Sequence, residues 1–182
     1  DADERSWGAE LEVPLSASMN LKLSYDDYQT EEGRDQSDAE LEVSYAFDAY
    51  WKAAFGVAYS KLYSPGAIAS GKSGYDGTRL DAGLRVDYRQ NDDYLYYGFV
   101  QGTVDRKGNI SKNDRYGVGA EVRLSEKLGV EGEVSWGESG IGGVAALTYD
   151  PTPEDHYYIG YRLDPDRATD GSYGYDLQGR DH

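Results

Sequence analysis

Cysteine is absent from the 182-residue sequence, and histidine and methionine are rare, at His156, His182 and Met19. Without cysteine, neither a disulfide framework nor a thiolate metal site can form. Two histidines also leave little material for hydrolytic or metal chemistry, in which histidine is the commonest proton carrier and metal ligand. We therefore expect neither an enzyme nor a protein with a bound cofactor.

Basic residues are scarce as well. The chain has 18 lysines and arginines against 34 aspartates and glutamates, which gives a formal net charge of −16. Phosphate binding needs a basic surface, so this balance argues against nucleic acid as a partner. Adhesion by charge to an anionic membrane surface is disfavoured for the same reason.

Long hydrophobic runs are missing too, and none approaches the roughly 20 residues that a transmembrane helix needs. A membrane-spanning β-strand needs only about 9–11 residues and contacts lipid with every second one, so such strands remain open. What the sequence does have is 18 tyrosines and 23 scattered glycines. Disordered chains are poor in aromatic residues, and tyrosine and glycine among β-branched residues indicate a β-sheet.

Alternation of apolar and polar residues with a period of two is the dominant pattern, and it predicts about ten strands with no helical period between them. Eight segments alternate clearly: 7–13, 19–25, 40–48, 53–60, 78–89, 116–124, 128–136 and 157–163. Two more are ambiguous, because both faces of 94–104 carry bulky residues and 141–149 is mostly small residues.

Each predicted strand has one apolar and one polar face. The apolar face carries Leu41, Val43, Tyr45, Phe47, Phe55, Val57, Tyr59, Leu84, Val86, Tyr88, Val118, Val122, Trp136, Tyr157, Ile159 and Tyr161. The polar face carries Glu40, Glu42, Arg79, Asp81, Arg85, Asp87, Glu121, Arg123, Glu131 and Glu133. Acids and bases on the polar face nearly balance, so most of the net charge is expected in loops and turns.

The predicted connections alternate in length. Short ones are expected near 14–18, 48–51, 90–93, 125–127 and 150–155, and longer polar ones near 30–38, 65–77 and 105–114, with 137–140 as a short exception. Short turns at one end and long loops at the other are typical of outer-membrane barrels.

Two stretches carry a family resemblance: EVSYAFDAYWKAAFGVAYSKLY (42–63) and AEVRLSEKLGVEGEVSWG (120–137). They resemble the strand–tight turn–strand units of Gram-negative outer-membrane proteins of the porin and OmpA-like type. The resemblance covers most of residues 5–164 and is one of style, without a motif specific to one porin family. It implies an all-β, antiparallel up-and-down transmembrane barrel, located in the outer membrane among lipid and lipopolysaccharide, with a pore or structural role.

The domain organisation expected is one β-barrel domain over 1–182. The chain ends in Gly-Arg-Asp-His, whereas these proteins usually end in a strand whose last residue is aromatic. The short first connection would also place both ends of the strand array on the long-loop side. Our hypothesis is that the chain is an internal portion of a larger barrel, which a complete gene without further strands would contradict.

The sequence leaves several functions open. Alternation is compatible with a membrane barrel, and equally with a soluble β-sandwich or barrel that binds a ligand. Aromatic residues near strand ends, glycines mixed with charges on the polar face and the loop rhythm favour the membrane barrel. Its interior could be salt-bridged and structural, or a water-filled channel between opposed acidic and basic clusters. A scaffolding or adhesive component, bound to other envelope proteins, is the alternative to a pore.

Three weaker site hypotheses remain. The spacing of three aspartates would suit calcium ligands, although a solvated turn explains them better: Asp164, Asp166 and Asp170. His156 directly follows Asp155, which would allow a catalytic pair, but no serine has a nucleophile context, so we interpret His156 as a turn residue. Acidic residues expected in a loop could share divalent cations with lipopolysaccharide, bind a protein or simply stay hydrated: Asp26, Asp27, Glu31, Glu32, Asp35 and Asp38.

Overall fold

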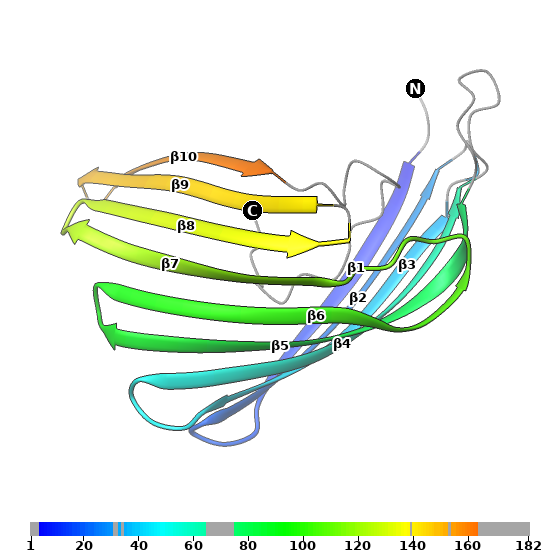
Figure 1. Ribbon diagram of the computed structural model, residues 1–182, viewed down its shortest axis with the longest axis horizontal. Helices are drawn as coiled ribbons and strands as arrows, with labels where there is room; N and C mark the ends of the chain where they lie inside the picture. The colour runs from blue at the N-terminus through cyan, green and yellow to red at the C-terminus, as the bar shows by residue number, and fades with distance from the viewer. Residues whose placement is uncertain are drawn as a thin grey trace.

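The described part of the chain folds as a ten-stranded antiparallel sheet in which every strand pairs with its neighbours in sequence, from β1 to β10 (Figure 1). A computed structural model describes residues 4–30, 33, 35–64, 75–138, 140–152 and 154–163. The strands are β1 (Glu4–Pro14), β2 (Met19–Thr30), β3 (Asp35–Ala46), β4 (Trp51–Ser64), β5 (Tyr75–Asn91), β6 (Tyr94–Gly108), β7 (Arg115–Ser125), β8 (Leu128–Gly137), β9 (Gly140–Thr152) and β10 (Asp155–Leu163). The predicted all-β, up-and-down architecture with about ten strands is confirmed.

The register of the ladders explains why the alternation persists across the sheet. Leu11 pairs with Leu23, Leu23 with Leu41, and Leu41 with Val57, so one row on one face is apolar. One residue along, Glu12 pairs with Lys22 and Lys22 with Glu42, so the matching row on the other face is charged. A slip of one residue would exchange the two faces, which pins the register.

The sheet curls strongly, so that it has a concave and a convex face (Figure 1). In the central strands most concave positions are buried, among them Ala54 and Ala58 of β4, while the convex positions beside them are exposed or half-buried. No pairing between β1 and β10 joins the residues that the structure describes, so these two strands are the edges of the sheet.

The connections fall at two ends, as expected, but several of the predicted bounds are wrong. Strands β2 and β3 take in Asp26, Asp27, Asp35 and Asp38, which we had assigned to a loop. Strand β6 likewise continues to Gly108, and His156 lies in β10 and not in a turn. Polar side chains do not stop a ladder, because its hydrogen bonds come from the backbone.

Three strands, β4, β5 and β6, have 14, 17 and 15 residues. These lengths exceed the roughly 9–11 residues that a strand needs to cross a membrane. Within the described ranges, no helix is long and apolar enough to span a membrane.

Candidate functional site on the concave face

The structure separates the two predicted sets of residues onto the two faces. All ten polar-face residues occupy concave positions, with Arg79, Asp81, Arg85 and Glu133 buried. The apolar-face residues occupy convex positions, and most are exposed; Phe47 lies one residue beyond β3, with its ring centroid 5.0 Å from that of Tyr45. Their roles as lumen and lipid-facing residues remain predictions.

Aromatic pairs mark both ends of the convex face. Near the short turns, the ring centroids of Trp51 and Tyr88 are 4.8 Å apart and those of Tyr149 and Tyr157 are 6.4 Å apart. Near the other end, Trp7 pairs with Tyr25 at 4.9 Å, and Tyr116 stacks on Trp136 at 5.8 Å. Aliphatic residues lie between these two levels, as in the apolar band of an outer-membrane barrel.

Charges on the concave face are segregated by strand. In the described part of β1–β3, this face carries one basic side chain, Lys22, and the acids Glu10, Glu12, Asp26, Asp38, Glu40 and Glu42. In β4–β7 bases predominate: Lys52, Arg79, Arg85, Arg89, Arg106, Arg115 and Arg123, beside Asp81, Asp87 and Glu121. The concave face therefore has an acidic part and a basic part.

A cluster around Tyr97 lies in the basic part. The Arg85 guanidinium carbon lies 4.0 Å from the centre of the Tyr97 ring, and Arg85 Nε donates to Asp87 Oδ1 at 2.6 Å. The Tyr97 hydroxyl donates to Glu133 Oε2 at 2.8 Å. The cluster links β5, β6 and β8, and a cation over an aromatic face is stabilising, more so when desolvated.

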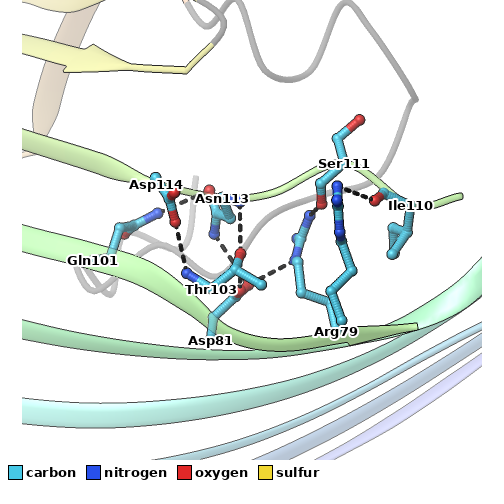
Figure 2. A network of polar contacts seen from close by, with 9 residues as sticks. Arg79, Asp81, Gln101, Thr103, Ile110, Ser111, Asn113 and Asp114 are labelled. Carbon is cyan, nitrogen blue, oxygen red and sulfur yellow. Dashed lines mark hydrogen bonds and ion pairs between the residues drawn. The ribbon is translucent and has the colours of Figure 1, made fainter. Parts of the chain in front are cut away.

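A second cluster surrounds Asp81 of β5 (Figure 2). Asp81 is fully buried and forms an ion pair with Arg79 Nε at 2.8 Å. It also accepts hydrogen bonds from the Thr103 hydroxyl at 2.8 Å and from Asn113 Nδ2 at 3.3 Å. Asn113 belongs to the connection 109–114, so the cluster joins that connection to the concave wall.

Sequence reasoning missed several of these residues, namely Asp26, Asp38, Gln101, Thr103, Arg106 and Asn113. Arg106 was assigned to the connection 105–114, because a β-bulge interrupts the alternation just before it. Leu80 pairs with Asp105 but Asp81 pairs with Thr103, so Val104 is an extra residue in β6. The bulge reverses the alternation and brings Arg106 opposite Arg79 on the concave face. The loss of clear alternation in 94–104 was the available signal.

The remaining candidates add no second site. Asp164, Asp166 and Asp170 lie outside the described residues, and within the described residues no group of three or more His, Asp or Glu could hold a metal ion. His156 Nδ1 contacts Asp150 Oδ1. At the turn end, a hollow of about 260 Å³ is lined by both signs of charge, including Arg89, Arg123, Glu121 and Glu131.

Comparisons with known proteins identify the fold. No protein-family model matches the sequence, and no curated protein matches it either. Among solved structures, the chain is similar to the KdgM porin in complex with disordered oligogalacturonate, with a TM-score of 0.51 and 11% sequence identity. The match covers 89% of this chain and 91% of that one. At this identity the likeness concerns the fold, and the chain thus has the all-β, up-and-down fold of an outer-membrane porin.

Proposed function

We propose that the chain forms a porin-like channel in the bacterial outer membrane and passes ions and small solutes along its concave face. The observation that carries the proposal is the division of one sheet into an exposed apolar face and a charged concave face. Neither face alone would be sufficient, because a membrane wall needs the first and an aqueous path needs the second.

The convex face supports the membrane location. Large apolar side chains are exposed along it, including Ile159 at 74% and Phe55 at 53% of their full accessible surface. A soluble protein would bury such side chains against a second layer, because contiguous exposed apolar surface favours association or a membrane. In the described residues the concave side, by contrast, buries polar residues such as Asp81, Arg85 and Ser135 beside small and aromatic ones.

The concave face supports a water-filled interior over a dry, salt-bridged one. In the acidic part, the described ion pair of Lys22 Nζ with Glu10 Oε2 is 3.0 Å long, but the acids outnumber this base. Carboxylates without matching cations are very unfavourable away from water. Water and mobile ions therefore have to reach this part of the face.

The charge pattern also bears on the solute. The similar porin was solved with oligogalacturonate, a polyanion. The acidic part of the concave face over β1–β3 disfavours a long polyanion here, since like charges would line the path. Opposed acidic and basic parts suit small ions and dipolar solutes.

A membrane location also requires partners for the edge strands. In lipid, each unpaired backbone group costs several kcal/mol, so open sheet edges do not occur there. The proposal therefore entails that the outer edges of β1 and β10 are paired in the membrane. Because the strands alternate in direction, β1 and β10 are antiparallel to each other.

Planar-bilayer recording of the purified protein tests the proposal. We expect discrete conductance steps, together with heat-modifiable migration on a gel that shows a folded barrel. A folded protein that inserts without conductance and co-purifies with an envelope partner would instead support a scaffold.

A further inference from the structure

The connection between β6 and β7, residues 109–114, follows an unusual path, and we call it the inner segment. The ladder between β6 and β7 stops at Gln101 and Arg115, whereas β6 continues beside β5 to Gly108. The inner segment returns from Gly108 to Arg115 over the concave side of this extension (Figure 2). Its Ile110 and Asn113 are only 1% and 3% exposed.

The start of the inner segment is fixed by the backbone. Gly108 has φ of +82°, a conformation that glycine adopts without strain, and an added Cβ there would lie 1.9 Å from the Asp76 carbonyl oxygen. The Asn109 amide donates to that same oxygen at 3.0 Å, and the Asp76 amide donates to Asn109 Oδ1 at 2.6 Å. The chain therefore turns inward at a defined position.

Two arginines hold the middle of the inner segment. Arg106 Nη1 donates to the Ile110 carbonyl at 3.1 Å. Arg79 Nη1 donates to the Ser111 carbonyl at 2.8 Å (Figure 2). Arg79 and Arg106 lie directly opposite each other on β5 and β6, where like charges repel. The Asp81 carboxylate beside Arg79 offsets this repulsion.

The end of the inner segment is held by Thr103 and its neighbours. The Thr103 hydroxyl donates to Asp81 and accepts from the Asn113 amide, both at 2.8 Å. The Thr103 amide donates to Asp114 Oδ1 at 2.8 Å, and Gln101 Nε2 donates to Asn113 Oδ1 at 3.0 Å. The hydrogen bonds around Thr103 hold the end of the inner segment in one arrangement, because buried polar groups that have their partners are rigid. Among the described residues, Arg79 Nη2 is buried and has no hydrogen-bond partner.

We propose that the inner segment is a fixed constriction of the channel, and that Asp81 and Thr103 are the positioning residues that set how far it reaches into the lumen. The inference rests on the proposed function, because a constriction needs a channel. Loosening the network leaves the strands in place and lets the inner segment move, which changes the narrowest cross-section.

Thr103→Val tests the inference, because valine keeps the shape of threonine and removes the hydroxyl that both donates and accepts. The matched control is Thr78→Val, which makes the same change on the convex face of β5, on the opposite side of the sheet from the inner segment. We expect Thr103→Val to change the single-channel conductance roughly two-fold and to add open-state noise, since conductance follows the narrowest part of the path. Thr78→Val should conduct as the parent does.

A second variant tests the inference if Thr103→Val does not fold. Asn113→Ala lies in the inner segment itself and removes its side-chain bonds to Gln101 and Asp81 without altering a strand. Heat-modifiable migration shows whether each variant is folded. Folded variants whose conductance and noise equal those of the parent would overturn the inference.

Thiol labelling gives a readout that does not depend on conductance. The chain has no cysteine, so Ile110→Cys and Lys112→Cys each introduce a single thiol. With the inner segment in place, we expect a hydrophilic maleimide to react with the buried position about ten-fold more slowly than with the exposed one, because labelling needs access to the thiolate. Adding Thr103→Val should remove this difference.

The two readouts separate the possible failures. Equal labelling rates in the otherwise unchanged chain would show that the inner segment is not seated, and would overturn the inference while leaving a conducting channel. Absence of conductance from the folded parent would overturn the proposed function and the constriction with it, even if the labelling rates differ.

Discussion

Two glycines of β7 provide space for aromatic rings of β6. Tyr97 pairs with Gly119, and a Cβ added to Gly119 would lie 2.3 Å from the Tyr97 ring. Phe99 pairs with Gly117, where an added Cβ would lie 2.8 Å from the Phe99 ring. The Tyr97 ring cannot easily move aside, because Arg85 lies over its face and Glu133 accepts a hydrogen bond from its hydroxyl.

Gly119→Ala should therefore destabilise the protein by roughly 1–3 kcal/mol, the usual range for overpacking a filled site. Gly132→Ala is the matched control, because nothing lies within 4 Å of a Cβ added there. Urea titration of the protein refolded into lipid vesicles measures both. A Gly119→Ala midpoint equal to that of the control would show that the Tyr97 ring is not held in place.

At the scale of the strand, alternation alone predicted most of the sheet. The sequence predicts which residues lie on each face, because side chains alternate strictly along an extended chain. Examples are Phe55 and Leu84 in one row on the convex face and Arg85 on the concave face. The ambiguity of β6 has a physical cause: Tyr97 and Phe99 can be bulky and concave because glycines lie beside them in β7.

The features that the sequence did not reveal depend on neighbouring strands. The extra residue Val104 makes a bulge only relative to β5, so alternation read along one strand did not reveal that β6 continues, and Arg106 was assigned to the connection 105–114. The path of the inner segment depends on Asp81, which precedes Asn113 by 32 positions in the chain. Asp26 and Asp38 were taken for loop residues because they are acidic, yet they pair directly in the β2–β3 ladder.

The orientation of the strands predicts how sensitive each position is to charge. Leu84 lies in the middle of β5 on the convex face, between Phe55 and Val100 of the adjacent strands. Leu84→Arg should cost about 2–4 kcal/mol of folding free energy in lipid, as arginine does near the middle of a bilayer.

Ile141→Arg provides the comparison at the end of the same face. Ile141 pairs with Trp136, at the level of the aromatic residues, where the cost of arginine falls to about 0–1 kcal/mol. Folding into vesicles, followed by urea titration, gives both values. Equal, small effects would indicate that the convex face contacts water, as in a soluble sheet.

For the whole molecule, the positions of the charged residues say more about function than the net charge does. The net charge of −16 excludes few functions by itself. The concave face concentrates acids on β1–β3 and bases on β4–β7, so an electric field crosses the path between them. A nearly balanced interior can thus discriminate between solutes, because each sign of ion is drawn to a different part of the wall.

This arrangement predicts opposite effects from neutralising the two parts. Glu12 and Glu42 flank Lys22 in one cross-strand row of the acidic part, whereas Arg89 and Arg123 line the hollow at the turn end. Glu12→Gln with Glu42→Gln should shift the permeability ratio roughly two-fold toward anions, and Arg89→Gln with Arg123→Gln by a similar factor toward cations, since wall charges set the local ion concentrations.

Reversal potentials across a salt gradient measure these shifts. They should shrink at 1 M salt, where the screening length falls to about 3 Å, and be largest near 0.1 M, where it is about 10 Å. Glu138→Gln, in the exposed connection between β8 and β9, is the control and should leave the ratio unchanged. Shifts of the same sign from both double variants would contradict two opposed parts of one wall. A shift from Glu138→Gln as large per charge as that of the double variants would mean that ions respond to the total charge of the protein.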